Sequence, residues 1–571
     1  MIRKVSIQRR QFASIKGQDL HPVVARVLAA RGLTRTPDYS LAGLLPPTMG
    51  GLSRAAAILA DAICTDRSIL VVGDFDADGA TGTALAVRAL KMMGAKQVHW
   101  RVPDRFRHGY GLSVDLVNEI AEPLPEVLVT VDQGVSSLAG VDRARDRGFK
   151  VIVTDHHLPG QQLPAADAIV NPNLHGDPFP SRNLAGVGVM FYTALAVRAE
   201  LRQRGWFKRQ QPRLDSLLDL VALGTVADLV PLDENNRRLV YQGLARIRSG
   251  RCAPGLRALL EVAGRNLRHI QAADLGFAAA PRLNAAGRLD DMGIGIRCLL
   301  ADSEREAHSI AIQLDQLNAE RQSIQAEMQQ HAEAQAEAMA ERIEGDAQGL
   351  CVFDPEWHQG VVGLVAGRLM ERLQRPVIAF APAEAGSNEL KGSGRSPAQL
   401  HMRDLLVDIA AANPGLVKRF GGHARAAGLS LELARLDDFR RAFDLQLAGI
   451  RFQDEQVITD GRLAAEEFSV ETAEALAEAG PWGQAWPEPL FDGVFVVLER
   501  RLVGQSHMKM RLRPCGGGPE LDAIAFRAGH LCHQELPDPL PLTFRLELNR
   551  WRGQITAQLN VQHLVEGIVQ E

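Results

Sequence analysis

Long apolar segments are missing from this chain of 571 residues. It contains no stretch of 18 apolar residues, the length that a membrane-spanning helix requires. The first residues, MIRKVSIQRRQF, lack the apolar run of a secretory signal. Low-complexity tracts and internal repeats are missing as well. We therefore expect a soluble, cytoplasmic protein that makes no membrane contact.

Cysteine pairs and an excess of positive charge are missing too. The 6 cysteines are scattered, and no two of them form a CxxC pair. This spacing argues against a zinc ribbon or a disulfide framework, and it fits a reducing compartment. The net charge of −4 does not indicate a nucleic-acid binder. Any contact with DNA must therefore come from local basic patches.

Short apolar runs alternate with helical patterns in the first third of the chain. The runs SILVV (68–72), VHWRV (98–102), EVLVTV (126–131) and KVIVT (150–154) predict buried strands. Strand–helix alternation at this spacing is typical of βαβ units and a parallel sheet. The sequence therefore predicts an α/β domain, followed by a mainly helical stretch from residue 187 to about 300.

The later segments predict a long helix, a second α/β unit and a β-rich end. Residues 303–344 contain no glycine or proline, which favours one helix joining two domains. A coiled-coil dimer is an alternative, but sustained apolar heptads are absent. The strands expected after residue 455 suggest a small barrel or a sandwich. The expected division is an N-terminal segment (1–50), a parallel-sheet α/β domain (51–300), a connecting helix (301–347), a smaller α/β domain (348–452) and a β domain (453–571).

The sharpest local signal is acidic. Asp74, Asp76 and Asp78 follow the apolar run 69–72, and ligand sites of open parallel sheets lie beyond the carboxyl ends of the strands. Three aspartates there would repel one another unless cations neutralised them. An EF-hand is rejected because Leu85 stands where its bidentate Glu is needed, and a strand precedes the motif. A solvated acidic turn is the alternative that this motif alone leaves open.

The same pattern recurs at two later strand ends and once in a helical stretch. Asp132 follows the third predicted strand, and Asp155, His156 and His157 follow the fourth. A single strand-end aspartate is often a helix cap, but several in one sheet are hard to explain in that way. Asp228 lies in an apolar segment, where an unpaired charge is costly to bury. Mixed Asp and His ligands favour Mn²⁺ or Mg²⁺, and the carboxylates suffice for two ions that share a bridging aspartate.

Four blocks in a fixed order resemble the DHH phosphoesterase superfamily. They are DFDADG (74–79), VDQG (131–134), DHH (155–157) and GTVADLVPL (224–232). The likeness extends to the RecJ-type exonucleases of that superfamily and covers nearly the whole chain. It includes RVPDRFRHGYGLS (101–113), PRLNAAGR (281–288), LNAERQ (317–322), GSGRS (392–396), GGHARAAG (421–428) and GPWGQAWPEPLF (480–491). Gln133 is a local departure from the family pattern that puts no essential residue in doubt.

The resemblance implies a role for each residue of the acidic blocks. It makes Asp132 the bridging metal ligand, places Asp74 as a ligand or close to one, and assigns His157 to the substrate phosphate or the attacking water. Asp155 orients its neighbours. The metal ligands that it implies are Asp76, Asp78, Asp132, His156 and Asp228.

The resemblance also implies a substrate-binding domain across a cleft from the metals, and an OB-like module at the C-terminal end. Closely spaced glycines let backbone N–H groups approach phosphates, and an arginine can grip one with two nitrogens; ordinary turns are the alternative. The implied substrate contacts are Arg105, Arg282, Ser393, Arg395, Gly422 and His423. The basic residues of the OB-like strands, Arg500, Arg501, Lys509, Arg511 and Arg513, would track single-stranded DNA, unless that face is merely solvated.

The function that follows is exonuclease activity on single-stranded DNA from the 5′ end, by two-metal hydrolysis, in recombination and repair. Polarity and strand preference come from the resemblance alone. Expected partners are a single-strand-binding protein and a recombination helicase. One alternative is a small-oligonucleotide phosphodiesterase or pyrophosphatase, which would not need the C-terminal module. Another is an inactive scaffold, but that would require the loss of metal ligands, and none is lost.

Overall fold

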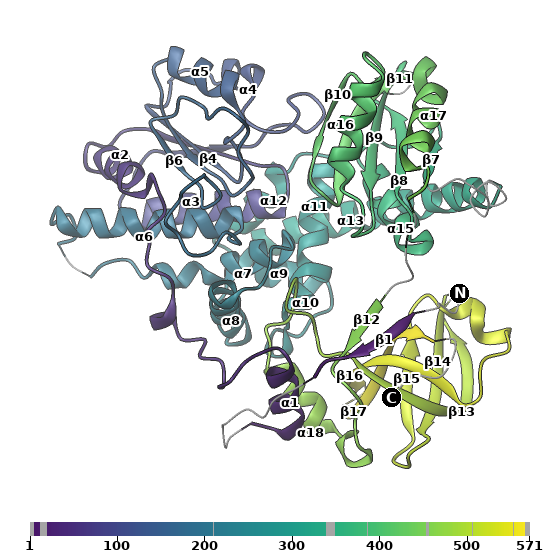
Figure 1. The fold of residues 1–571 in the computed structure, drawn as a ribbon. Helices are drawn as coiled ribbons and strands as arrows, with labels where there is room; N and C mark the ends of the chain where they lie inside the picture. Colours follow the sequence, from purple (N-terminus) through teal and green to yellow (C-terminus); the bar gives the residue numbers. More distant parts are fainter. Residues whose placement is uncertain are drawn as a thin grey trace. The chain divides into compact units, whose positions relative to one another are not determined.

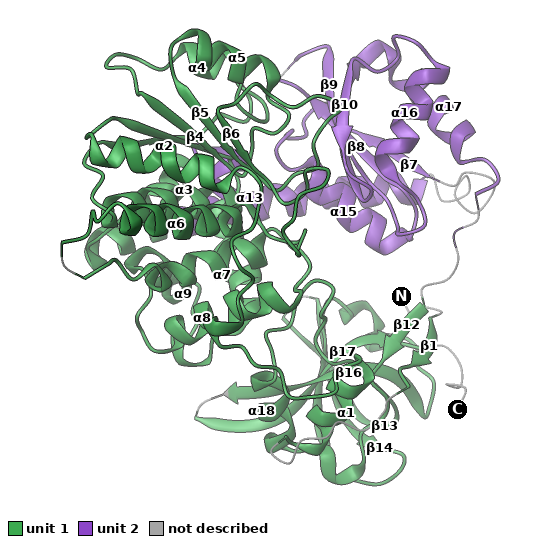
Figure 2. Ribbon diagram, turned by 60° about the vertical axis from the view of Figure 1, so that its left-hand side comes forward, with its two compact units in different colours: residues 1–283, 292–311, 454–571 green, residues 284–291, 312–453 purple. Residues whose placement is uncertain are grey.

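The structure is a computed structural model that describes residues 5–11, 20–208, 210–338, 349–384, 386–450, 452, 456–504, 506–551 and 553–565. The chain forms two compact units (Figure 2). Unit 1 contains residues 1–283, 292–311 and 454–571, and unit 2 contains residues 284–291 and 312–453. Within the described residues, no helix combines the length and apolar character that crossing a membrane requires.

A parallel sheet forms the centre of the first α/β domain in unit 1 (Figure 1). Its strands are β2 (Ile69–Gly73), β3 (Val98–Arg101), β4 (Val127–Val131), β5 (Lys150–Thr154) and β6 (Ala168–Val170). The order is β3-β2-β4-β5-β6, and every neighbouring pair is parallel. The four predicted strands are confirmed. Strand β6 was not predicted, because three residues give too short a pattern.

Helices cover both faces of this sheet because its strands are apolar on both sides. On one face, α4 (Val114–Asn118) and α5 (Leu138–Asp146) pack on Leu70, Leu128 and Val151. Helices α3 (Ala77–Met92) and α6 (Gly186–Gln203) contact the strands and each other. The chain passes from β2 to β3 and then returns to place β4 on the other side of β2. This reversal is the topological switch point where open sheets bind ligands.

Helix α2 (Leu52–Cys64) comes before the sheet in the chain. The helices that come after the sheet are α7 (Leu218–Ala227), α8 (Glu234–Arg248), α9 (Pro254–Val262), α10 (Ala272–Asp274), a π-helical turn (Leu275–Ala279), α11 (Ala280–Leu289), which continues into unit 2, and α12 (Gly293–Leu300). The predicted long helix is α13 (Glu304–Ala338), which begins in unit 1 and continues into unit 2. The last residues of that prediction, 339–344, lie outside the described residues.

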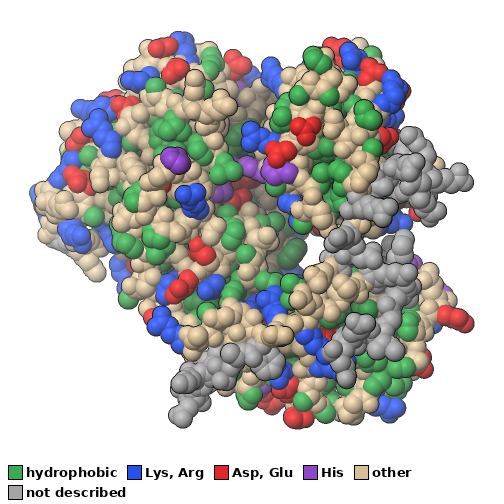
Figure 3. All heavy atoms as spheres, in the orientation of Figure 1, with side chains coloured by type: hydrophobic (Ala, Val, Ile, Leu, Met, Phe, Trp, Pro, Cys, Tyr) green, Lys and Arg blue, Asp and Glu red, His purple; other side chains and the backbone are tan. Residues whose placement is uncertain are grey.

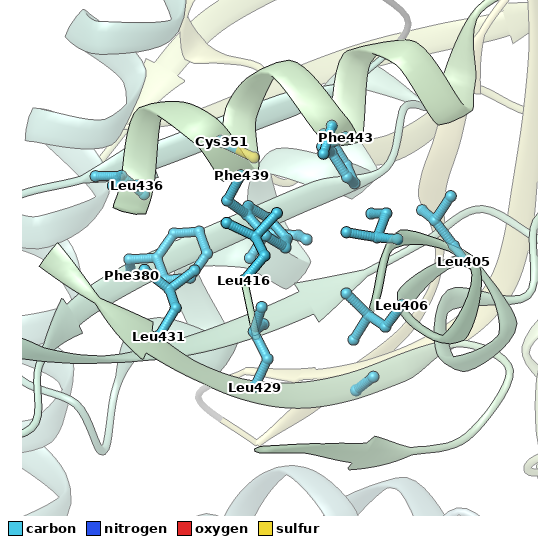
Figure 4. Close-up of a cluster of buried hydrophobic side chains, with 14 of the residues drawn as sticks. Cys351, Phe380, Leu405, Leu406, Leu416, Leu429, Leu431, Leu436, Phe439 and Phe443 are labelled. Atoms are coloured by element: carbon cyan, nitrogen blue, oxygen red, sulfur yellow. The ribbon is translucent and has the colours of Figure 1, made fainter. Parts of the chain in front are cut away.

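Unit 2 is built on a mixed sheet of order β10-β11-β9-β8-β7. The strands are β7 (Leu350–Phe353), β8 (Val377–Pro382), β9 (Glu389–Arg395), β10 (Arg419–Gly422) and β11 (Ala426–Glu432). Helices α16 (Met402–Ala412) and α17 (Leu436–Leu447) cover one face through a core that contains Phe380, Phe439 and Phe443 (Figure 4). Helices α13 and α15 (Val362–Leu373) share a second core. The GSGR glycines lie in the regular strand β9, so the ordinary-turn alternative is wrong for them.

The C-terminal domain is a closed barrel, so the barrel is the correct one of the two folds that the sequence predicted for this domain. Its strand order is β13-β14-β15-β17-β16. The strands are β13 (Phe491–Val503), β14 (His507–Pro514), β15 (Leu521–Ala525), β16 (Leu540–Trp551) and β17 (Gln554–Leu564). The N-terminal segment joins this domain, because β1 (Ser6–Arg9) pairs with β12 (Gln456–Thr459) and α1 (Pro22–Ala30) contacts α18 (Val470–Glu478). On the face in Figure 3, acidic and basic side chains are interspersed over the described residues.

Candidate metal centre

The DFDADG segment connects β2 to α3 at the switch point. Asp76 is the N-cap of α3, and its Oδ1 accepts the Gly79 N–H at 3.0 Å. Asp78 points from the first turn toward the start of α6. Its carboxylate accepts the Gly186 N–H at 2.6 Å and the Val187 N–H at 3.0 Å. Two backbone amides at a helix N-terminus thus hold one carboxylate of the acidic motif in a fixed orientation.

Asp132 lies at the end of β4, next to the start of α6. Its φ angle of 64° is in the left-handed region, which is uncommon for residues with a side chain, although Asp adopts it more readily than most. A Cβ at Gly186 would lie 2.6 Å from Asp132 Oδ1, so only glycine allows α6 to begin here. Gln133, the departure from the family pattern, is buried and donates to the Gly73 carbonyl at 2.6 Å, which joins the ends of β4 and β2.

The histidine and the late aspartate reach the same place. His156 Nε2 lies 3.1 Å from Asp132 Oδ1 and 3.4 Å from Asp228 Oδ2. Asp228 ends α7, where its N–H donates to the Gly224 carbonyl. Three overlapping sets have ligand atoms within 4.8 Å of one another: Asp132 with His156 and His157, Asp78 with His156 and Asp228, and Asp74 with Asp76 and Asp132. All the acidic blocks singled out in the sequence therefore meet in one cluster.

Asp155 contacts the cluster through His157. His157 Nδ1 lies 2.8 Å from Asp155 Oδ1, which also accepts the His156 and His157 N–H groups. The other Asp155 oxygen accepts the Val135 N–H at 2.9 Å. The Tyr110 hydroxyl lies 3.0 Å from the same His157 nitrogen. Asp155 thus contacts both histidines, and its role in orienting them remains a prediction.

The electrostatics of the cluster favour a cation. Burial raises the pKa of Asp74 to about 8 and that of Asp78 to about 7, and repulsion from Asp76 adds to both. Burial and neighbouring carboxylates raise the pKa of Asp132 and Asp228 well above the usual range. Within the described part of the chain, buried Asp74 Oδ1 has no hydrogen-bond donor. Oxygen-rich sites with imidazole fit Mn²⁺ or Mg²⁺, so the residues present fit the predicted metals.

The same carboxylates stabilise the charged form of His157, whereas they destabilise the charged forms of one another. Burial alone lowers the pKa of its ring, but the hydrogen bond to Asp155 and the nearby carboxylates raise it to about 9. Burial alone would raise the pKa of Asp155, but the hydrogen bond and charge of His157 lower it. The two residues thus stabilise each other's charged forms.

The implied substrate residues divide between the two units. Arg105 lies beside the acidic cluster, with its guanidinium 4.2 Å from the centre of the Phe75 ring. Burial lowers the pKa of Arg105, while Asp74 and Asp76 raise it. Arg282 lies on α11, where its NH1 donates to the Ala278 carbonyl at 2.7 Å.

The other four implied substrate residues belong to unit 2. Arg395 NH1 donates to Ser393 Oγ at 2.9 Å, and burial lowers the pKa of this guanidinium. Strands β9 and β11 pair there, and β10 pairs with β11, which brings Gly422 opposite Ala427. The His423 N–H donates to the Ala426 carbonyl at 2.7 Å. The glycine motifs thus occupy neighbouring strands of one sheet.

Strand β14 of the barrel has the predicted alternation. Met508, Met510 and Leu512 are buried in the barrel, whereas Arg511 and Arg513 are exposed. Positive charge and apolar side chains therefore lie on opposite faces of the strand, as its period of two requires.

The charge of that outer face is partly neutralised. Lys509 Nζ lies 2.8 Å from Asp522 Oδ2, and Arg511 Nε lies 3.4 Å from Glu520 Oε2. Among the described residues, Arg513 has no such acidic partner. A role for this face in DNA binding remains a prediction.

Several residues of the centre were missed in the sequence. Tyr110 stands inside a block that carried the resemblance, but its hydroxyl gave no signal by itself. Gly186 and Val187 act through backbone N–H groups, which no motif reveals. Asn171 and Asn173 follow the unpredicted strand β6, and the polar NPN sequence after an apolar run was the available signal.

Models of three domain families match the chain. Residues 68–225 match the DHH family, N-terminal domain; residues 346–449 match the DHHA1 domain; and residues 459–563 match the RecJ OB domain. Two solved structures of RecJ from Thermus thermophilus are similar over 99% of this chain and about four-fifths of theirs. The complex with Mn²⁺ has a TM-score of 0.81 at 31% identity, and the complex with Mg²⁺ has a TM-score of 0.75 at 29% identity.

Two curated relatives match along nearly their full length. The single-stranded-DNA-specific exonuclease RecJ of Dickeya dadantii is 50% identical, over 98% of this chain and 98% of the relative. The protein of the same name from Escherichia coli is 47% identical, over 99% of this chain and 100% of the relative. The likeness to these relatives thus covers the acidic blocks, the second α/β domain and the barrel of this chain. The chain belongs to the RecJ family of DHH phosphoesterases.

Proposed function

We propose that this protein is a metal-dependent exonuclease that hydrolyses single-stranded DNA from its 5′ end and acts in recombination and repair. The observation that carries the proposal is the cluster of three overlapping groups of possible metal ligands, which share Asp132 and His156. The proposal is supported by a relative named as a single-stranded-DNA-specific exonuclease, to which this chain is 50% identical over 98% of the relative's length. The 5′ polarity and the biological process rest on family membership.

The proposed metal ligands are Asp76, Asp78, Asp132, His156 and Asp228, with Asp132 shared between two ions. Mn²⁺ or Mg²⁺ bound there would lower the pKa of a water molecule and neutralise charge on the phosphate. The chain's own residues provide orientation. Asp78 is fixed by two amides. Asp155 holds the ring of His157, and we assign this ring to the substrate phosphate or the attacking water.

The other domains would handle the strand. We assign catalysis to residues 51–300, substrate binding to residues 348–452 after the connecting helix (301–347), and single-strand binding to residues 453–571. Arg105, Arg282, Ser393, Arg395, Gly422 and His423 are the proposed substrate contacts. A single-strand-binding protein and a recombination helicase are the proposed partners, again from family membership.

The proposal is tested with DNA labelled separately at the 5′ and 3′ ends. With Mn²⁺ or Mg²⁺, single strands labelled at the 5′ end should release labelled mononucleotide at once, while the 3′ label should stay on shortening fragments. Blunt duplex DNA should remain intact, and so should single strands incubated with EDTA. Degradation of short oligonucleotides alone would support a small-oligonucleotide phosphodiesterase, and no cleavage of any substrate would support a scaffold.

Substituting alanine for Arg395 should weaken substrate handling more than metal binding. Its guanidinium is bonded to neutral groups, Ser393 Oγ and the Gly394 carbonyl, so its charge is available to a phosphate. We expect slower cleavage at limiting DNA and unchanged Mn²⁺ affinity by calorimetry. Arg435→Ala, which removes an exposed ion pair with Asp438, is the matched control. Lost Mn²⁺ affinity with normal DNA affinity would show that the role is wrongly assigned.

Reversing charge on the barrel should affect binding but not chemistry. Lys509→Glu with Arg511→Glu would place new carboxylates beside Asp522 and Glu520. We expect weaker single-strand binding at moderate salt and a shallower salt dependence, by ~0.7 in the logarithmic slope for each phosphate that the protein no longer neutralises. Cleavage at saturating DNA should persist, because the proposed metal ligands all precede residue 230.

The control for this reversal is Arg440→Glu with Arg441→Glu, which makes the same change in net charge on α17, where both arginines form ion pairs. An unchanged salt slope in the folded barrel variant would mean that the face is only solvated and that the strand binds elsewhere.

A further inference from the structure

Four asparagines form hydrogen bonds with segments that carry, or lie next to, the proposed metal ligands. They are Asn171 and Asn173, which follow β6, Asn183, which precedes α6, and Asn236 in the first turn of α8. We call them the asparagine network. None of them is a proposed ligand, and each donates a side-chain N–H to a backbone carbonyl or a carboxylate of a neighbouring segment.

The first part of the network holds the two histidines. Asn171 Nδ2 donates to the His157 carbonyl at 2.8 Å, and Asn173 Nδ2 donates to the His156 carbonyl at 2.6 Å. Asn171 Oδ1 also accepts the Asn173 N–H at 2.8 Å, which keeps the two amides in a fixed relation. These bonds fix the main chain at His156 and His157, while their rings remain directed toward the carboxylates.

The second part extends to the segment that orients Asp78. Asn173 Nδ2 lies 3.3 Å from the Arg182 carbonyl, and Asn236 Nδ2 donates to the Asn183 carbonyl at 2.6 Å. Asn183 Nδ2 in turn donates to Asp233 Oδ2 at 3.1 Å. This segment leads directly to the N–H groups of residues 186 and 187 that hold the Asp78 carboxylate.

The third part reaches the segment after Asp228. Asn236 Nδ2 donates to the Pro231 carbonyl at 2.9 Å, and the Asn236 N–H donates to Asp233 Oδ1 at 2.9 Å. The exposed fraction of Asn236 is 0%. One buried amide therefore ties the chain that follows Asp228 to the chain that precedes α6.

We infer that the asparagine network is a positioning device that sets the metal affinity of the centre. The inference rests on the proposed function, because it concerns the same ligands. Carboxylates that repel one another separate unless their main chain is held. A neutral amide can hold it without competing with a cation, whereas an arginine or lysine would occupy the carboxylates. Residues that support metal ligands in this way typically cost about 10- to 100-fold in metal affinity or activity when they are removed.

The test measures Mn²⁺ binding by calorimetry in the full-length protein without DNA. Asn173→Ala and Asn236→Ala should each weaken Mn²⁺ affinity by about 10-fold or more. The Mn²⁺ concentration for half-maximal cleavage should rise in parallel, and the maximal rate should recover at saturating Mn²⁺. Affinity for single-stranded DNA in EDTA should equal that of the wild type. The matched control is Asn413→Ala, which removes a similar side-chain donor to a backbone carbonyl in unit 2.

The outcomes separate this inference from the proposed function. A wild-type protein that neither binds Mn²⁺ nor cleaves DNA would overturn the proposed function. Normal wild-type behaviour with unchanged Mn²⁺ affinity in the variants would overturn only the network, as would a lower maximal rate at unchanged affinity. If the fully buried Asn236 proves essential for folding, the half-buried Asn173 decides the question by itself.

Discussion

Substituting alanine for Asp132 is expected to abolish hydrolysis of single-stranded DNA while the fold remains intact. Asp132 lies within 4.8 Å of ligand atoms in two of the three candidate groups, so its loss removes the proposed bridge between two ions. Asp228→Ala should have the same effect, because Asp228 completes the third group with His156. Metal and nucleophile are then lost together.

These substitutions should not lower the stability of the metal-free protein against unfolding. Burial and the charges of Asp78, Asp76 and other carboxylates hold the pKa of Asp132 well above its usual range, so the native carboxylate is a source of repulsion. We expect Asp132→Ala to unfold in EDTA at the wild-type temperature or above it. Mn²⁺ should raise the Tm of the wild type by mass action, and this shift should disappear in the variant.

The control for both substitutions is Asp115→Ala, which removes an exposed carboxylate in the first turn of α4. It should keep the wild-type rate and the Mn²⁺-induced rise in Tm. Turnover near the wild-type value in folded Asp132→Ala or Asp228→Ala would exclude the two-metal assignment.

Much of this centre could be predicted from the sequence, because its acidic residues follow apolar strands directly. In a parallel sheet, carboxyl ends meet at one edge, so Asp74 and Asp132 had to lie close together once β2 and β4 were recognised. Asp228 could be added because an unpaired charge in an apolar helix requires a partner. The alternation of Lys509 and Arg511 with apolar residues likewise fixed which face of β14 is outside.

The features that escaped prediction depend on contacts between distant segments. Strand β6 is too short to show the alternating pattern of a strand. The hydrogen bond from Asn173, which follows it, to the His156 carbonyl could therefore not be foreseen. The pairing of β1 with β12 joins distant parts of the chain, with Ser6 opposite Gln456, without a shared motif. The ion pair of Lys509 with Asp522 is a cross-strand contact, and it reduces the charge that the sequence of β14 alone suggested.

A single methyl group at Gly186 is expected to disable the centre. The added Cβ of Gly186→Ala would lie 2.4 Å from Asp132 Cβ and 2.6 Å from Asp132 Oδ1, which is too close for non-bonded atoms. Either Asp132 or the start of α6 must move, and the Gly186 N–H that orients Asp78 moves with the helix. Displacement of about 1 Å at a reacting centre costs about 100-fold in rate.

Gly188→Ala is the matched control, because it makes the same substitution slightly farther along α6. Its added Cβ would meet Leu184 Cδ2 at 3.2 Å, the far end of a flexible side chain that can shift. Alanine also favours a helix over glycine by about 1 kcal/mol, so this variant should be at least as stable as the wild type and fully active. Gly186→Ala should fold, bind Mn²⁺ more weakly by calorimetry and cleave single-stranded DNA about 100-fold more slowly. Equal rates for the two variants would show that the contact between α6 and Asp132 tolerates a methyl group, and that glycine is not required where α6 begins.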